Sequence, residues 1–213
     1  MIGVILAQGK GLRLRPITRV IPKNLIVING KPIIEHQIDY LHKYGINNVY
    51  VITSGYEKVW ENFRKSHDVT ILSSPEPLGT AGCLTLLNVS DDMIVMNGDV
   101  LTTIDLNQLI RCDQQFIGCI SLVKMRSPYG IVKVEKNYVV SFEEKPLLPH
   151  LINAGVYYFR PDVLDLVSEG DMFEDKVLPM LASLRLLGFV NYDNVEWRSI
   201  DSTKDIESGT RPQ

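Results

Sequence analysis

The chain has 213 residues, of which 45% are hydrophobic and 22% are charged, so it is neither a disordered, a collagen-like nor a coiled-coil protein. This length predicts one α/β domain that can bury a core without disulfides or structural metals. Lysine and arginine number 22 against 25 acidic residues, a net charge of −3, and no run of like charges occurs, so we expect neither nucleic acid nor a membrane as a partner.

The first half of the chain alternates predicted strands with predicted helices. An apolar run at residues 2–7, ended by glycines, predicts a strand buried on both faces. It is too short for a signal peptide or a transmembrane helix. The alternation favours a parallel sheet covered by helices. The further predicted strands are 25–28, 48–53, 69–72 and 93–96, and the predicted helices are 32–45, 57–64 and 81–87.

The second half favours antiparallel strands at residues 116–123, 130–135 and 138–143, because Lys136-Asn137 makes a tight turn between the last two. A further strand is predicted at 153–159. These strands make the predicted sheet mixed rather than purely parallel.

The segment Asp171-Met172-Phe173-Glu174 has the spacing of a capping box, which predicts the start of a helix. No repeat or linker divides the chain, so we expect a single domain, 1–213, with halves 1–112 and 113–213 that meet near Asp113. The helix that follows the capping box presents an apolar stripe that we expect in the core, formed by Phe173, Val177, Met180, Leu181 and Leu184.

The three cysteines, Cys83, Cys112 and Cys119, are an odd number and lack C-x-x-C spacing. This pattern argues against a disulfide framework and against a cysteine-rich zinc site. It predicts a protein of the reducing cytoplasm.

The first predicted strand leads into a glycine loop rich in cations. Residues 7–16 read Ala-Gln-Gly-Lys-Gly-Leu-Arg-Leu-Arg-Pro, and such glycines let backbone N–H groups approach phosphate oxygens closely. The dinucleotide fingerprint fails because Leu14 stands where it requires glycine, and the Walker pattern has no match. On these residues alone, a phosphate-binding loop and an ordinary solvated loop stay equally open.

Two aspartates stand out by position. Asp99 follows the predicted strand 93–96 through Asn97-Gly98, which places a carboxylate at the C-terminal end of a parallel strand, where open α/β sheets bind ligands. An aspartate after glycine also suits a plain turn. Asp201, followed by Ser202 and Thr203, also has the pattern of a helix N-cap.

Several motifs, in the same order along the chain, resemble those of the sugar-nucleotide pyrophosphorylases, the NDP-sugar nucleotidyltransferase family. Its opening signature L-A-G-G-x-G-T-R-L-x-P-L-T is similar to residues 6–18, and its P-K pair to Pro22-Lys23. The resemblance implies a Rossmann-like three-layer α/β/α sandwich with a mostly parallel, mixed central sheet, of the nucleotide-diphospho-sugar transferase type. The further matching segments are 29–34, 77–82, 97–99, 129–130, 144–146, 153–157 and 200–201.

The resemblance also implies roles for individual residues. The loop after the first strand would wrap the nucleotide, and fixed cations would stabilise the charge that grows on the phosphates. Two carboxylates would hold Mg²⁺, which prefers oxygen ligands. The residues implied are Ala7, Gly9, Gly11 and Gly79 for the nucleotide, Arg13, Lys23 and Lys145 for catalysis, Gly130, Glu144, Lys145 and Asn153 for the sugar phosphate, and Asp99 and Asp201 for the metal.

The activity that the resemblance implies is Mg²⁺-dependent transfer of a nucleotidyl group from a nucleoside triphosphate to a sugar 1-phosphate, with release of pyrophosphate. Those two substrates are the expected partners, and a homo-oligomer stays open. One alternative is a cytidylyltransferase for a non-sugar phosphate, such as a polyol or choline phosphate. Another is a non-catalytic module that senses a nucleotide or a sugar.

The sequence departs from the family pattern at three positions. Gln8 replaces a glycine, Leu12 replaces threonine or serine, and Ser74 stands where relatives read the base with Gln or Glu. The sequence therefore does not predict which nucleotide base the protein binds. The closing motif is one residue shorter than the family's common form, so the motif aligns Asp201 with the family less closely than it aligns Asp99. Because the chain ends at Gln213, we expect a catalytic domain alone.

Overall fold

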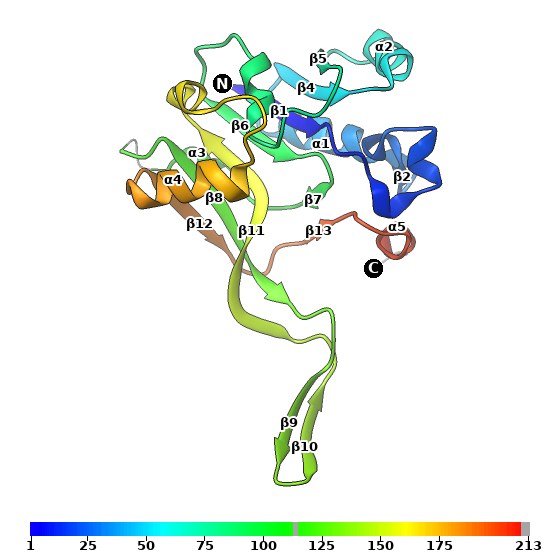
Figure 1. Cartoon of the computed structure of the whole chain (residues 1–213), viewed down its shortest axis with the longest axis vertical. Coiled ribbons are helices and arrows are strands. Elements are labelled where there is room, and N and C mark those ends of the chain that lie inside the picture. Colours follow the sequence, from blue (N-terminus) through cyan, green and yellow to red (C-terminus); the bar gives the residue numbers. More distant parts are fainter. Residues whose placement is uncertain (113–114, 210–213) are drawn as a thin grey trace.

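The computed structural model describes residues 1–112 and 115–209, and a seven-stranded sheet forms its centre (Figure 1). β1 lies between two parallel neighbours, and β11 runs antiparallel to both strands beside it. The expected mostly parallel, mixed sheet is therefore confirmed. In order across the sheet, the strands are β12 (Leu187–Tyr192), β8 (Gly118–Arg126), β11 (Leu147–Phe159), β6 (Met93–Asn97), β1 (Ile2–Ala7), β4 (Val49–Ser54) and β5 (Thr70–Ser74).

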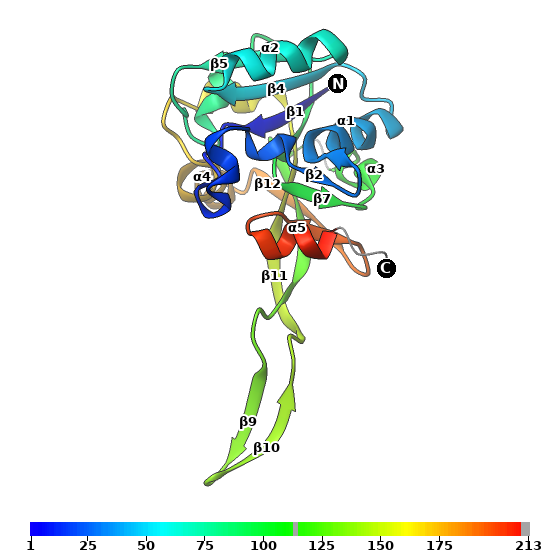
Figure 2. The same cartoon turned by 90° about the vertical axis from the view of Figure 1, so that its right-hand side faces the viewer.

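Two apolar clusters lie on the two faces of this sheet, because successive residues of a strand point to opposite faces. All six residues of β1 are buried. Ile5 packs in the cluster that α1 and α2 cover, whereas Val4 packs in the cluster that α4 covers. Figure 2 shows these layers from the side, and the three-layer sandwich is confirmed. The helices are α1 (Ile33–Lys43), α2 (Glu57–Ser66), α3 (Leu106–Ile110), α4 (Leu178–Ser183) and α5 (Thr203–Gly209).

Short two-stranded ladders flank the main sheet, and the sequence patterns did not predict most of them. β2 (Val27–Ile28) pairs with β3 (Lys31–Pro32), so the strand expected at 25–28 is only two residues long. The first residue of the expected strand, Leu25, belongs instead to a 3₁₀ turn, Lys23–Leu25. The helix expected at 81–87 is likewise a 3₁₀ turn, Gly82–Leu86. The strands without a sequence prediction are β3, β7 (Val100–Thr102), β12 and β13 (Trp197–Ser199).

The expected capping box at Asp171 is wrong. The Asp171 carboxylate accepts hydrogen bonds from the Ser168 N–H, at 2.9 Å, and from Lys176 Nζ, at 2.8 Å. Met172 occupies the N-cap position, and its side chain makes no cap hydrogen bond. Thr80 Oγ1 instead accepts a hydrogen bond from the Phe173 N–H at 2.8 Å, so a distant segment caps the turn that precedes α4.

The three expected antiparallel strands divide between two structures. β8 and β11 join the main sheet, whereas β9 (Ile131–Glu135) and β10 (Tyr138–Glu143) form a hairpin that projects far from the body (Figures 1 and 2). We call residues 127–146 the arm. Both halves of the chain contribute strands to one sheet, and Asp113, the expected seam, lies outside the described residues.

Two of the three cysteines differ from the expectation that the protein has no disulfide. Cys112, after α3, and Cys119, in β8, pair as a disulfide, so the argument against disulfides is wrong for this pair. Cys83 is free and buried, and burial raises the pKa of its thiol to about 12. The cytoplasmic location stays a prediction. None of the helices within residues 1–112 and 115–209 has the length and apolar character that a membrane span requires.

Replacement of Phe173 with alanine should destabilise the fold strongly. Its ring is fully buried and stacks on Tyr157 and Phe159, each with ring centroids 5.2 Å away. Loss of a buried phenyl ring leaves a cavity, so the free energy of unfolding should fall by about 3–5 kcal/mol in urea titrations. Phe189→Ala is the control, because Phe189 is 64% exposed. Equal losses in the two variants would contradict the proposed role of the ring stack.

Candidate functional site

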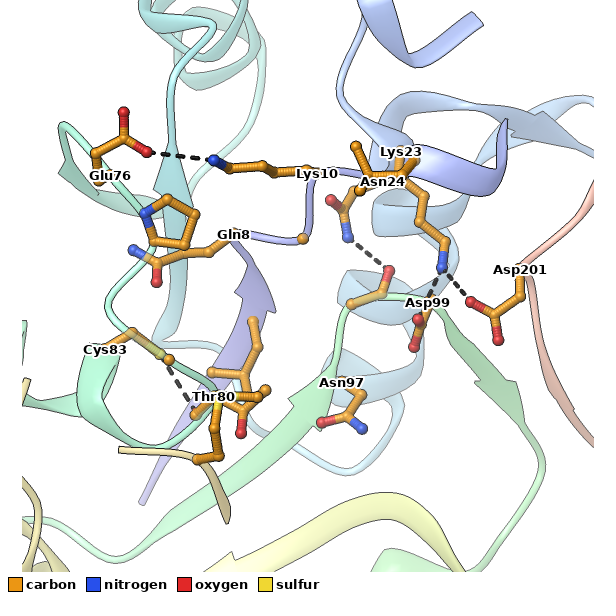
Figure 3. Close-up of a pocket in the computed structure, with 18 of the residues that line it drawn as sticks. Gln8, Lys10, Lys23, Asn24, Glu76, Thr80, Cys83, Asn97, Asp99 and Asp201 are labelled. Carbon is orange, nitrogen blue, oxygen red and sulfur yellow. Dashed lines mark hydrogen bonds and ion pairs between the residues drawn. The ribbon is translucent and has the colours of Figure 1, made fainter. Parts of the chain in front are cut away.

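A cavity of about 940 Å³ opens where β1 and β6 end (Figure 3). The chain passes from β1 to β4 and β5 on one side of β1, and then returns to β6 on the other side. Parallel sheets bind ligands at such a switch point, outside the carboxyl ends of the strands. Six separate segments contribute to the lining, namely Leu6 with 8–13, 23–24, residues within 76–83, 97–99, Gly170 with Met172, and Asp201.

The glycine loop after β1 forms one wall. Gly9, Gly11 and Arg13 line the cavity, whereas Ala7, at the end of β1, does not. Gly11 has a φ of +56°, and a Cβ there would lie 2.8 Å from Thr18 Cγ2. Thr18 Oγ1 also donates a hydrogen bond to the Gly11 carbonyl at 2.7 Å. The loop is therefore held in one conformation that only glycine fits at this position.

Lys23 lies between two carboxylates that line the cavity. Its Nζ is 2.8 Å from Asp99 Oδ2 and 2.8 Å from Asp201 Oδ1 (Figure 3). The Lys23 side chain is only 10% exposed, whereas each aspartate side chain is about 30% exposed. Arg13 Nη2 also lies 2.9 Å from Asp201 Oδ1. The structure thus brings together the four charged residues that the family resemblance implied for the triphosphate and the metal.

A hydrogen bond from Asn24 helps to hold Lys23 beside Asp99. The neighbouring Asn24 donates from Nδ2 to the Gly98 carbonyl at 2.6 Å, and the Gly98 N–H donates to the Leu6 carbonyl at 3.0 Å. A Cβ on Gly98 would lie 2.2 Å from Asn24 Nδ2 and 2.3 Å from the Leu6 oxygen. A side chain at residue 98 would therefore separate the segment that carries Lys23 from the one that carries Asp99.

A short ladder brings Asp201 to the same place. β13 pairs with β7, and the Ile200 N–H donates to the Asp99 carbonyl at 2.9 Å. A helix does begin at Thr203, as the N-cap pattern indicated. Asp205 Oδ2 accepts the hydrogen bonds from the N–H groups of Asp201 and Ser202. The Asp201 carboxylate instead contacts Lys23, Arg13 and Ser199.

The environment of Asp201 favours its charged form. Burial alone would raise the pKa of this carboxyl, but hydrogen bonds from Lys23 and Ser199, with the charges of Lys23 and Arg13, lower it below the ordinary value. Ser199 Oγ donates to Asp201 Oδ2 at 2.7 Å. An anionic oxygen is thus kept available at the cavity.

Gln8, which departs from the family glycine, has a structural role. Its Nε2 donates to the Thr53 carbonyl at 3.1 Å and to Ser74 Oγ at 2.7 Å, and its Oε1 accepts from the Leu78 N–H at 2.9 Å. Ser74 Oγ in turn donates to the Glu76 carbonyl at 2.6 Å. Gln8 and Ser74 are thus coupled, and together they hold the segment 74–78 against β1 and β4.

The far end of the cavity is formed by the segment 76–83. Gly79, implied for the nucleotide, lines it with a φ of +86°, and Thr80 and Cys83 follow. Glu76, at the start of this segment, pairs with Lys10 of the glycine loop at 3.4 Å, and both side chains are exposed. Leu12 also lines the cavity, where the family hydroxyl would stand.

The residues implied for the sugar phosphate do not line the cavity. Gly130, Glu144 and Lys145 lie in the arm, where Lys145 Nζ is 3.8 Å from Glu144 Oε1. Asn153 lies in β11, and its Nδ2 donates to the Tyr157 hydroxyl at 2.8 Å. Their roles stay predictions.

Sequence reasoning assigned no role to Asn24 and Asn97, although both line the cavity. Within residues 1–112 and 115–209, Asn97 Oδ1 is buried without a hydrogen-bond partner. The only signal for Asn97 was its place directly before Gly98-Asp99, and Asn24 had only its place after Lys23.

Comparison with known proteins places this chain among nucleotidyl transferases. The family model described as "Nucleotidyl transferase" matches residues 2–198. One curated relative is mannose-1-phosphate guanylyltransferase catalytic subunit beta of Xenopus tropicalis, which is 32% identical over 98% of this chain. Another is probable mannose-1-phosphate guanylyltransferase 1 of Oryza sativa subsp. japonica, which is 32% identical over 99% of this chain. This chain spans about 63% of the length of the first relative and about 64% of the length of the second.

Solved structures confirm the fold. A putative glucose-1-phosphate thymidylyltransferase from Bacillus anthracis superposes with a TM-score of 0.76 at 21% identity, over 98% of this chain and 93% of that one. An inositol-1-phosphate CTP transferase from T. maritima superposes with a TM-score of 0.74 at 21% identity, over 95% and 90%.

Replacement of Asp201 with asparagine should make the free energy of unfolding depend less on pH in the acidic range. Because the folded-state pKa of Asp201 is lowered from 3.8, its contribution is present above that value and is lost as the pH falls through the folded-state pKa. The difference in unfolding free energy between wild type and Asp201→Asn should therefore be largest near about pH 7 and shrink toward about pH 3 in urea titrations.

The exposed Asp175 serves as the control for that comparison. Asp175→Asn should change stability little at either pH. A difference for Asp201→Asn that stays constant with pH would contradict the electrostatic account.

Proposed function

The chain belongs to the nucleotidyl transferase family, and from this premise we propose that it transfers a nucleotidyl group from a nucleoside triphosphate to a sugar 1-phosphate, making an NDP-sugar and pyrophosphate. The observation that carries the proposal is the cluster of Lys23, Asp99 and Asp201 in a cavity at the switch point of the sheet. The cavity combines a glycine wall, which suits phosphates, with cations and carboxylates at one end.

The chemistry requires alignment and charge stabilisation rather than a strong base. A phosphate monoester dianion is already a nucleophile, so its oxygen can attack the α-phosphorus once the two substrates are aligned. Negative charge then grows on the non-bridging oxygens and on the departing pyrophosphate. Arg13 and Lys23 are the cations that would stabilise that charge, and fixed cations in a partly buried site do this well.

The residues also fit a magnesium ion. Asp99 Oδ2 and Asp201 Oδ1 both lie 2.8 Å from one ammonium group, so these two oxygens converge on a single cation position. Mg²⁺ commonly takes one or two carboxylates together with substrate phosphates. We propose that Asp99 and Asp201 hold it, and when bound it would neutralise phosphate charge.

For the substrates we propose GTP and mannose 1-phosphate as the first pair. Two curated relatives that align over 98% and 99% of this chain are named mannose-1-phosphate guanylyltransferases. The cytoplasm is the compartment we propose for this reaction.

A second candidate is cytidylyl transfer to a non-sugar phosphate. One observation favours it, since the residues implied for the sugar phosphate lie outside the cavity lining. A structural neighbour is named an inositol-1-phosphate CTP transferase. A sensor without catalysis is disfavoured, because binding alone does not require a buried lysine between two carboxylates.

Lys23→Ala and Asp99→Asn should each lower turnover by about 100-fold or more while the fold persists, because each removes charge stabilisation at the reacting phosphates. Pyrophosphate release at saturating substrates measures this. Lys31→Ala is the matched control, since Lys31 pairs with the exposed Asp39 outside the cavity lining. Normal turnover in a folded Lys23 or Asp99 variant would refute the assigned roles.

The metal proposal is testable without turnover. Lys23→Met should tighten Mn²⁺ binding to the free protein about fivefold or more in spin-resonance titrations, because the ammonium competes for the carboxylate oxygens. Asp99→Asn should weaken Mn²⁺ binding. An unchanged Mn²⁺ affinity in both variants would show that the ion binds elsewhere.

A further inference from the structure

Gln37 is a buried polar side chain on the core-facing side of α1, where its helix neighbours are apolar. It is only 1% exposed. Its Nε2 donates to the Asn97 carbonyl at 2.9 Å and to the Val100 carbonyl at 2.9 Å. These two carbonyls bracket Asp99, which we proposed above as a metal ligand. We call the segment from Asn97 to Val100 the Asp99 turn.

Every carbonyl of the Asp99 turn accepts a hydrogen bond from another segment. The Gly98 carbonyl accepts from Asn24 Nδ2 at 2.6 Å, and the Asp99 carbonyl accepts from the Ile200 N–H at 2.9 Å. Asn24 lines the main cavity, and Ile200 directly precedes a residue that does. Gln37 does not line that cavity and reaches the turn from α1. Its two hydrogen bonds therefore restrain the turn from outside the substrate site.

Burial of an amide at this place has a cost in stability. Gln37 Oε1 is buried and has no hydrogen-bond partner among the residues that the structure describes. The two carbonyl oxygens require a donor, which fixes the amide with its nitrogen toward the Asp99 turn. A buried acceptor without a partner destabilises a fold, and an apolar side chain of similar length would not have that acceptor. Core packing alone therefore does not explain a glutamine at this position.

The space between α1 and β7 is incompletely filled. A second cavity of about 220 Å³ lies there, and Gln37, Tyr40 and Val100 are among the residues that line it. Closely packed side chains hold a backbone segment in place, and a cavity removes part of that support. The hydrogen bonds from Gln37 provide a direct link across this space from α1 to the Asp99 turn.

We propose that Gln37 is a positioning residue, which holds the Asp99 turn so that the Asp99 carboxylate is placed for the metal ion and the phosphates. Partners that lie behind a metal ligand orient it, and their loss commonly lowers metal affinity or activity by about 10–100-fold. The effect on turnover rests on the function proposed above, whereas the effect on the turn itself does not. Because Gln37 lies outside the main cavity, it should contribute little to nucleotide binding.

Hydrogen exchange of the free protein tests the positioning without activity or metal. Gln37→Met keeps the length of the side chain and removes both hydrogen bonds, and Gln37→Leu is a second variant that removes them. The Gly98 and Ile200 N–H groups make hydrogen bonds at the Asp99 turn. Their exchange should become about tenfold faster or more in both variants, because the turn opens more easily.

Tyr40→Phe is the matched control on the same helix. It removes the hydrogen bond that the Tyr40 hydroxyl donates to the Ile104 carbonyl, outside the Asp99 turn. Exchange at Gly98 and Ile200 should stay as in the wild type. Urea titrations confirm that every variant is folded.

Metal binding and kinetics separate positioning from general destabilisation. Gln37→Met should weaken Mn²⁺ binding about fivefold or more in spin-resonance titrations and lower kcat about tenfold. The KM for the nucleoside triphosphate should change less than about twofold, because substrate contacts are kept. Tyr40→Phe should change none of the three quantities.

Two results would overturn the proposal. One is exchange at Gly98 and Ile200 that Gln37→Met leaves unchanged, or that Tyr40→Phe speeds equally. The other is faster exchange together with wild-type affinity for Mn²⁺. If the wild type released no pyrophosphate while exchange and Mn²⁺ binding changed as expected, the proposed function would fail and the positioning role of Gln37 would stand.

Discussion

The ammonium of Lys23, held between the carboxylates of Asp99 and Asp201, is the constraint on which the site depends. The three residues come from distant parts of the chain, and contacts of neighbouring residues help to place them. Asn24 ties the Lys23 segment to Gly98, and the β7–β13 ladder brings Asp201 beside Asp99. A nearly buried cation is tolerated only when it is paired, so these contacts must form together. Folding of the ladder and formation of the charge cluster are therefore coupled.

The sheet explains why this cluster lies where a nucleotide could reach it. β6 returns beside β1 after the chain has built β4 and β5 on the other side, which makes the ends of β1 and β6 a switch point of the sheet. The glycine loop, the Gly98 turn and the segment 76–83 all meet at the resulting cavity. Gln8 replaces the small residue of related loops, yet its amide is fully engaged with Thr53, Ser74 and Leu78. The Gln8 side chain is therefore held in the wall of the cavity.

Much of this architecture could be predicted from the sequence, because buried strands such as β1 and β6 are continuous apolar runs and α1 has a regular apolar stripe. The capping box at Asp171 could not be judged correctly, since its pattern is the same whether the carboxylate caps a helix or binds Lys176. The short strands β7 and β13 depend on pairing between distant segments, which local patterns do not reveal. The motifs predicted Lys23, Asp99 and Asp201, but not Asn24, whose contribution is a contact with the distant Gly98.

The most direct measurement is pyrophosphate release from ATP, CTP, GTP, UTP and dTTP, each combined with mannose, glucose, galactose, N-acetylglucosamine and inositol phosphates, with and without Mg²⁺. The account predicts release that depends on the metal and on one nucleotide–acceptor pair, with GTP and mannose 1-phosphate the expected pair. Release only with CTP and inositol phosphate would favour the second candidate function. No release from any pair, by protein that still binds a nucleoside triphosphate, would contradict the account.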